Sequence, residues 1–229
     1  MKNFYQKQHT FCQAVDCVIF GFDNGAIKLL LIHRKLEPYK GKWSVIGGFL
    51  QKKETLDNAA IRIVHDLTGL NNVFLEQLHT FSDPNRDPGG RVLSTTYFAL
   101  LKINEYDKEK TKSKNADWFE LNKLPSLIFD HTDMLKCALK HIQQKNRYQP
   151  IGFELLPEKF TITQLQKLYE SLYGKTFDSA NFRKKILSYG LLNRLDEKDK
   201  NHSKRGAFYY CFDKKKQIKQ TSANLFFHM

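Results

Sequence analysis

Polar and basic side chains gather on one side of a helix that the apolar spacing predicts over residues 179–189. Asn181, Arg183 and Lys184 lie off the apolar face, so they would point into solvent. When such a helix enters the major groove, Asn can read adenine, and Arg can bind guanine or a phosphate. The helix is therefore predicted to read DNA, with an ordinary solvated charged face as the alternative. Its buried face would hold Phe182, Ile186 and Tyr189.

A second basic segment follows this helix and connects two strand-like runs, residues 191–195 and 207–212. The connecting turn is rich in Lys, Asp, Asn, Ser and Gly, and its basic tip could reach the DNA backbone or the minor groove. Helix, turn, helix and a two-stranded ribbon is the order of a winged helix-turn-helix, while a generic small α+β domain is the alternative. We expect DNA contacts from Ser179, Asn181, Arg183, Lys184, Ser203, Lys204 and Arg205.

Upstream, residues 48–70 carry Gly, Glu and Arg at fixed spacing around another predicted helix. Glu54 follows Gly48 after five residues, Arg62 follows after seven more, and Gly69 ends the helix. This spacing resembles the Nudix box, a motif in which glutamates on one helix face of Nudix hydrolases hold a divalent metal ion. The resemblance implies that Glu54 and Arg62 pair and fix the loop onto the helix.

The metal-binding half of this box is broken. Where the resemblance implies three glutamates, the chain has Ile63, Asp66 and Leu67. Magnesium prefers hard oxygen ligands, and Ile and Leu offer none. We therefore expect no catalytic residue, no metal ion, no cofactor and no hydrolase activity. A hydrolase with displaced ligands is the alternative, with Glu76, Glu105 and Glu120 as the carboxylates that could be recruited.

Most of the chain, from Asp16 to Phe212, is similar to the Nudix-related transcriptional regulators, which join a Nudix-like sensor to a winged helix and bind operators as homodimers. Besides the box, the similarity is carried by residues 81–101, 160–186 and 203–212. The eroded box resembles most the arabinose-responsive members. This implies a repressor of sugar catabolism that senses a pentose such as L-arabinose. The alternatives are a regulator of NAD metabolism that senses ADP-ribose, and a Nudix pyrophosphohydrolase.

A sugar site needs several hydrogen-bonding side chains, usually beside an aromatic wall. We expect loop 82–91 to contribute most, although Asp83 and Asp87 each precede a proline and could simply shape their turns. Trp43 could equally belong to the core. The candidates for the ligand site are Asp16, Arg34, Trp43, Asp83, Arg86, Asp87 and Arg91.

The elements that must position these residues predict two domains of an α+β protein. Residues 1–149 would form a Nudix-like domain, an α/β/α sandwich around a mixed sheet, and residues 150–229 a winged helix-turn-helix. In the second domain Thr161 and Gln164 fit a capping box, and Asp178 would cap the reading helix. The first domain would contain strands at 14–22, 27–33, 43–46, 73–81, 92–103 and 118–121, with helices at 55–68 and 130–144.

Charge and composition favour the same interpretation. The 229 residues carry a formal net charge of +13, and residues 150–229 hold 15 Lys and Arg against 8 Asp and Glu. A surplus of this size attracts polyanions. The four cysteines form no C-x-x-C pair, and we expect neither a secretory signal nor a membrane span. We expect a cytoplasmic protein whose partners are double-stranded operator DNA, a small-molecule effector and a second copy of the chain.

Overall fold

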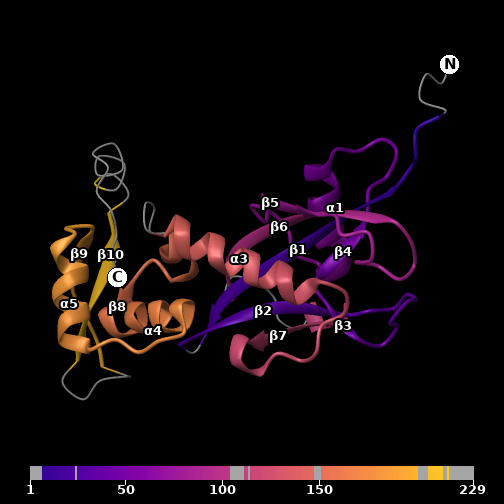
Figure 1. The fold of residues 1–229 in the computed structure, drawn as a ribbon. Coiled ribbons are helices and arrows are strands. Elements are labelled where there is room, and N and C mark those ends of the chain that lie inside the picture. The colour runs from indigo at the N-terminus through magenta and orange to yellow at the C-terminus, as the bar shows by residue number, and fades with distance from the viewer. Residues whose placement is uncertain are drawn as a thin grey trace.

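The computed structural model describes residues 7–23, 25–103, 111–112, 114–146, 151–200, 206–213 and 216. A mixed sheet with helices on its faces forms one end of the molecule, and a smaller group of helices with a three-stranded sheet forms the other (Figure 1). The predicted α+β fold class, a mixed-sheet domain followed by a winged helix, is confirmed. None of the helices in the described ranges has the length and apolar character needed to cross a membrane.

The large sheet is built around a parallel pair, β1 with β6, and every other pairing in it is antiparallel. Its order is β3-β2-β1-β6-β5, with β4 also on β1 and β7 also on β2. Because β1 is central and covered on both faces, its sequence does not alternate, and from Ala14 to Phe22 every residue except Asp16 is apolar. The strands are β1 (Cys12–Asp23), β2 (Ala26–His33), β3 (Trp43–Ser44), β4 (Ile46–Phe49), β5 (Glu76–Phe81), β6 (Val92–Lys102) and β7 (Ala116–Glu120).

One long helix covers each face of this sheet. Helix α1 (Leu56–Thr68) begins at its N-cap Thr55, whose hydroxyl accepts a hydrogen bond from the Asn58 amide, and ends at Gly69, which has a φ of 74°. It packs on the face that carries Val15, Cys17 and Ile19. Helix α3 (His131–Lys145) packs on the opposite face, where its apolar residues meet the other side of β1. A short 3₁₀ turn, η2 (Leu121–Lys123), follows β7.

The second domain has the element order predicted for a winged helix. Thr161 and Gln164 form the expected capping box at the start of α4, and Asp178 accepts the Asn181 amide at the start of α5. Its three strands lie in the order β8-β10-β9. The elements are η3 (Ile151–Leu155), β8 (Phe160–Thr161), α4 (Ile162–Tyr173), α5 (Ser179–Ser188), β9 (Leu192–Asp199) and β10 (Ala207–Phe212).

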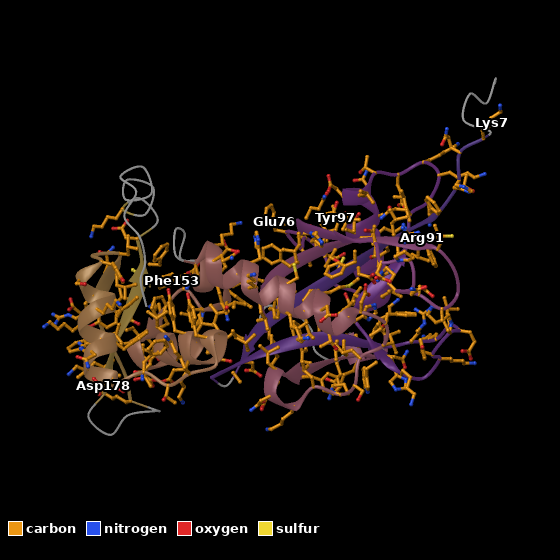
Figure 2. All side chains as sticks on the ribbon, viewed as in Figure 1. Lys7, Glu76, Arg91, Tyr97, Phe153 and Asp178 are labelled. Atoms are coloured by element: carbon orange, nitrogen blue, oxygen red, sulfur yellow. The ribbon has the colours of Figure 1, made fainter. Side chains whose placement is uncertain are left out.

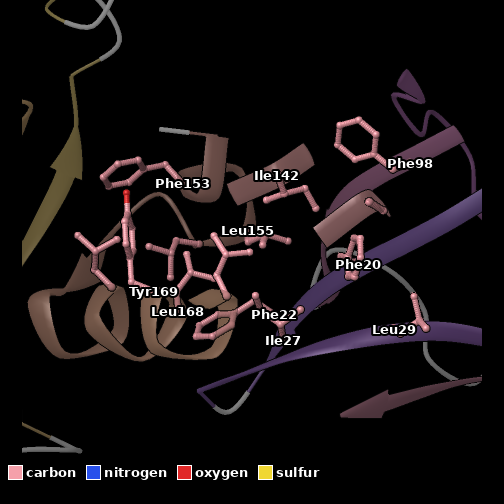
Figure 3. Close-up of a cluster of buried hydrophobic side chains, with 14 of the residues drawn as sticks. Phe20, Phe22, Ile27, Leu29, Phe98, Ile142, Phe153, Leu155, Leu168 and Tyr169 are labelled. Atoms are coloured by element: carbon pink, nitrogen blue, oxygen red, sulfur yellow. The ribbon is translucent and has the colours of Figure 1, made fainter. Parts of the chain in front are cut away.

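The two domains share one hydrophobic core. Phe22 and Ile27, at the end of the β1–β2 hairpin, lie in the same buried cluster as Leu168 and Tyr169 of α4 (Figure 3). Two polar contacts add to this junction, because the Ser171 hydroxyl accepts the Ile27 amide at 2.9 Å and the Gln143 side chain donates to the Leu172 carbonyl at 2.8 Å. The winged helix is therefore held against the sheet and against the last turns of α3.

Several local predictions differ from the structure, and the ribbon strand predicted at 191–195 extends from Leu192 to Asp199. The run at 43–46 forms two strands, because Trp43 and Ser44 pair with β2 whereas the residues from Ile46 onward pair with β1. The strand expected from Val73 begins only at Glu76. Tyr189, which was expected to be buried, is only half-buried at the end of α5. Each difference depends on strand pairing or helix-end packing that the local pattern does not encode.

The shared core predicts that damage in the winged helix also destabilises the sheet domain. Leu168→Ala should lower the free energy of unfolding by about 2–5 kcal/mol, because the side chain is fully buried. Both tryptophans, Trp43 and Trp118, lie in the sheet domain, so tryptophan fluorescence during denaturant unfolding reports on that domain alone. In Leu168→Ala we expect the unfolding midpoint followed by fluorescence to fall together with the midpoint followed by far-UV circular dichroism. An unchanged fluorescence midpoint in Leu168→Ala would contradict a shared core. The control is Lys185→Ala, a change at an exposed position of α5 that should leave both midpoints in place.

Candidate ligand site and nucleic-acid surface

The loop before α1 is fixed by a bidentate ion pair. Arg62 Nε lies 2.9 Å from Glu54 Oε2, and Arg62 Nη2 lies 2.6 Å from Glu54 Oε1. Arg62 also donates to the Phe49 carbonyl, while Glu54 accepts the Gln51 amide. Hydrogen bonds from Arg62 lower the pKa of Glu54, so the pair stays charged. This clamp ties the end of β4 to α1, as the sequence predicts for these two residues.

The helix face that would hold a metal ion is occupied by packing instead. Ile63 is buried against Gly48, where an added Cβ would come within 3.1 Å of the isoleucine side chain. Leu67 packs against the same core, and Asp66 is exposed beside His65. Glu76 pairs with Lys145 and Glu120 pairs with Lys123, while Glu105 lies outside the described residues. No group of three His, Cys, Asp or Glu side chains within the described ranges could hold a metal ion.

A buried network of charges lies on the opposite face of the sheet, at the start of α3. Arg86 makes a bidentate pair with Asp130, at 2.8 and 2.7 Å, and its Nη2 lies 3.7 Å from Asp16 Oδ2. The Ser94 hydroxyl donates to the same Asp16 oxygen at 2.5 Å. Burial alone would lower the pKa of Arg86, but the Asp130 hydrogen bond and the charges of Asp16, Asp130 and Asp87 raise it instead. The guanidinium is therefore held as a permanent cation between two carboxylates.

His131 closes this network from the first turn of α3. Its Nδ1 accepts the Val45 amide at 3.3 Å, so in the neutral ring the proton lies on Nε2, 3.9 Å from Asp16 Oδ1. Burial lowers the pKa of His131, which keeps the imidazole neutral. Gly47 leaves room for the Asp16 carboxylate, since a Cβ there would come within 2.0 Å of Asp16 Oδ1. This position excludes any side chain.

Two aromatic residues with unusual backbone conformations stand beside the network. Tyr39 and Phe129 have φ values of 67° and 49°, a region that bulky residues rarely adopt. Their rings meet edge to face at 5.3 Å, and Phe129 makes a similar contact with His131. The Arg34 guanidinium lies over the Phe129 ring, 5.2 Å from its centroid. Backbone strain of this kind concentrates at functional sites.

Of the seven predicted ligand residues, the structure brings three, Asp16, Arg34 and Arg86, around the start of α3. Asp83 and Asp87 accept amides within their own loop, from Asn85 and Gly89, and so shape its turns. Arg91 donates to the Ser82 carbonyl and lies over Phe11. Trp43 packs edge to face against His33 and Phe119 at the margin of the core.

Sequence reasoning missed the residues that complete the network: Ser94, Asp130 and His131. Asp130 was expected only to begin a helix, and its side chain makes no capping hydrogen bond there because both oxygens bind Arg86. The one available signal was an Asp-His pair at a helix start. The partners lie 44 to 86 residues away along the chain, so the pairing leaves no local pattern.

The predicted reading helix presents its polar residues as expected. Ser179, Asn181, Arg183 and Lys184 of α5 are exposed, while Phe182 and Ile186 are buried. Arg183 donates from Nη2 to the buried Tyr210 hydroxyl at 3.1 Å, which fixes its guanidinium beside the ribbon. Figure 2 shows Asp178, at the start of this helix, at the opposite end of the molecule from Arg91. The other three predicted DNA contacts, Ser203, Lys204 and Arg205, lie outside the described residues.

Comparison with known proteins identifies both domains. The model of the NUDIX domain matches residues 10–138, and the model of the NrtR DNA-binding winged helix domain matches residues 152–212. A relative from Acinetobacter baylyi, named ADPR responsive transcriptional repressor NtrR, is 33% identical over 202 residues, which cover 86% of this chain and 80% of the relative. An ADP-ribose pyrophosphatase of Methanocaldococcus jannaschii is 40% identical over 113 residues, which cover 49% of this chain and 66% of that protein.

Among solved structures, Shewanella oneidensis NrtR complexed with a 27mer DNA matches with a TM-score of 0.75 and 27% identity, over 90% of this chain and 95% of that chain. A second crystal structure of the same protein matches with a TM-score of 0.69 and 28% identity, over 87% of this chain and 93% of that chain. These matches span both domains, so the arrangement of the whole chain is similar.

The expectation of a pentose sensor akin to the arabinose-responsive regulators is wrong. The relative that matches along most of its length is a repressor named for its response to ADPR. The physical error was to infer the ligand from the lost metal ligands, because those glutamates serve cleavage of a diphosphate. A pocket that no longer cleaves can still bind one.

The buried network predicts a large penalty for removing its cation. Arg86→Met should lower the free energy of unfolding by about 3–5 kcal/mol, because it leaves the buried Asp16 carboxylate without its nearest cation. Denaturant unfolding followed by tryptophan fluorescence measures this. Arg91→Met, on the same loop but only half-buried, should cost less than about 1 kcal/mol. Equal losses in the two variants would show that Arg86 has no special role.

His131 predicts a dependence of stability on pH. Because its pKa in the folded protein is depressed below the ordinary value of 6.5, the unfolded chain binds the extra proton first as the pH falls. The contribution of neutral His131 to the free energy of unfolding is complete above pH 6.5 and is lost as the pH falls below that value. Unfolding free energies measured at neutral and at mildly acidic pH should therefore fall more in the wild type than in His131→Gln. Parallel losses would assign the effect to other histidines.

Proposed function

The chain belongs to the family of Nudix-domain regulators that carry an NrtR winged helix, and we propose that it is a transcriptional repressor whose Nudix domain senses ADP-ribose. The observation that carries the proposal is the match to an ADPR-responsive repressor along 80% of that protein, through both the sensor and the winged helix. ADP-ribose is formed when NAD loses nicotinamide, so such a repressor would control NAD metabolism. We propose that it acts as a homodimer on two half-sites.

The DNA-binding part of the proposal is supported by the surface of α5. Six polar or basic side chains of this helix are exposed, whereas Phe182 and Ile186 are turned into the core. Asn181 and Arg183 can form bidentate contacts with adenine and guanine, while Ser179 and Lys184 can hold phosphates. The match to an NrtR solved with DNA supports the same use of this domain.

The sensing part is supported by the charge network and its rim. Asp16, Ser94 and Arg86 offer acceptors and donors for the hydroxyls of a ribose. Arg34 is half-buried over Phe129, so a cation and an aromatic face are available together for a diphosphate and an adenine ring. We propose Asp16, Arg34 and Arg86 as ligand residues, and we assign Trp43, Asp83, Asp87 and Arg91 to the surrounding walls and turns.

We further propose that the Nudix domain binds without hydrolysing. In a Nudix hydrolase the metal ion must activate water and neutralise charge on the diphosphate. Here Ile63 is buried against Gly48, and Leu67 packs partly buried against the core, so neither position offers an oxygen ligand. The similarity to an ADP-ribose pyrophosphatase supports the ligand class and keeps hydrolysis as the rival function.

The direct test is a gel shift on the DNA upstream of the protein's own gene. We expect the full chain to bind this DNA and ADP-ribose to release the protein from it. Arabinose, xylose and AMP serve as control compounds, and we expect them to leave the complex intact. ADP-ribose can release the DNA only if it binds the DNA-free protein more tightly than the DNA-bound protein. Its affinity, measured by calorimetry, should therefore weaken when that DNA is present.

Three outcomes would contradict the proposal. DNA binding that ADP-ribose does not change would remove the sensing function. Magnesium-dependent formation of AMP from ADP-ribose by the pure protein would establish the rival hydrolase. Failure to bind duplex DNA, with tight binding to single-stranded RNA, would remove the repressor function altogether.

A further inference from the structure

The ribbon of the winged helix contains a bulge that brings two cations to one aromatic ring. Phe208 pairs with Lys198 and Tyr210 pairs with Arg194, so residues 195–197 of β9 lie opposite the single residue Tyr209 of β10. A bulge shifts the side chains of the longer strand relative to its partner. The Arg194 guanidinium carbon lies 4.7 Å from the Phe208 centroid, and the Lys198 ammonium nitrogen lies 4.5 Å from it.

These two cations keep their charge available. Arg194 and Lys198 are both exposed, and within the described part of the chain neither forms an ion pair with a carboxylate. The nearby acidic residue Glu197 is instead bound by Lys159, at 2.7 and 2.8 Å. An aromatic face attracts a cation without neutralising it, unlike a carboxylate. The ring therefore restrains both side chains while leaving their charges free to meet an anion.

The pair continues a row of cations that begins on the reading helix. Arg183 of α5 donates to the Tyr210 hydroxyl, and its guanidinium carbon lies 6.0 Å from the centroid of that ring. Tyr210 and Phe208 lie two positions apart on β10, which runs beside α5 in Figure 1. Each of the three cations is therefore held by an aromatic residue of the same strand, on the side of the ribbon that α5 covers.

We propose that Arg194 and Lys198 bind phosphates of the DNA backbone beside the groove that α5 enters, and that Phe208 is a positioning residue for both. The inference rests on the proposed DNA-binding function and adds contacts on the body of the ribbon to those of the reading helix. Lysine and arginine side chains lose rotamer freedom when they bind. Contact with Phe208 restricts them in advance, which lowers the entropy lost on binding.

The first test removes the two charges. The full chain is titrated with a random-sequence DNA duplex at several salt concentrations, and the slope of log K against log salt is measured. Arg194→Gln/Lys198→Gln should reduce the slope by about 2, since each phosphate contact contributes about 0.9. The same relation gives roughly 60-fold weaker binding near 0.1 M salt. The control, Lys123→Gln/Lys136→Gln, removes two exposed charges from the Nudix domain and should leave the slope unchanged.

The second test separates positioning from charge. Phe208→Tyr keeps the aromatic face and should retain wild-type affinity. Phe208→Leu removes the face and should weaken binding roughly fivefold while leaving the salt slope in place, because the cations remain but are less restrained. Equal affinity of the Leu and Tyr variants would overturn the positioning role. Melting temperatures of both variants show whether the loss reflects folding.

The outcomes distinguish this inference from the proposed function. If the wild-type chain binds the duplex and the double variant keeps the full slope, the phosphate contacts on the ribbon are disproved and the repressor proposal stands. If the wild-type chain binds neither this duplex nor the DNA upstream of its own gene, both proposals fail together.

Discussion

The junction between the β1–β2 hairpin and α4 constrains the whole molecule. Phe22 and Ile27 share one buried cluster with Leu168 and Tyr169, and the Ile27 amide is bound by Ser171 across the same boundary. Two domains joined only by a linker would move independently. Here the winged helix uses the sheet of its neighbour to complete its own core, so its orientation depends on the Nudix domain.

Helix α3 connects the charge network to this junction. Its first residue, His131, contacts Asp16 and Val45, and its N-cap residue Asp130 binds Arg86. Near its other end, Gln143 donates to the Leu172 carbonyl of α4. A ligand that alters the pairing of Arg86 and Asp130 would act on a helix whose far end contacts the DNA-binding domain. Packed elements respond to such changes as units, which gives a small shift at one site a defined effect at the other.

The sequence predicted the elements well where local physics decides them. Thr161 and Asp178 are N-caps as expected, and the largely apolar sequence of β1 matches a strand covered on both faces. The candidate site was predicted less completely. Asp16 and Arg86 were named, but Asp130 and His131 were not, because their roles arise from contacts between distant segments. The β9 bulge also has no simple sequence signature, and the ligand was inferred wrongly from a motif that reports on catalysis.

The two functional surfaces treat charge in opposite ways, and solvation explains why. In the Nudix domain Arg86 is buried, so it must be paired and hydrogen-bonded, and its partners Asp16 and Asp130 fix it in one orientation. On the ribbon Arg194 and Lys198 are exposed, where hydration makes a free charge stable, and an aromatic ring can restrain them without cancelling that charge. The buried network therefore offers a ligand charged and polar groups in one fixed arrangement. Unneutralised cations suit DNA, whose phosphates supply the missing partner charge only in the complex.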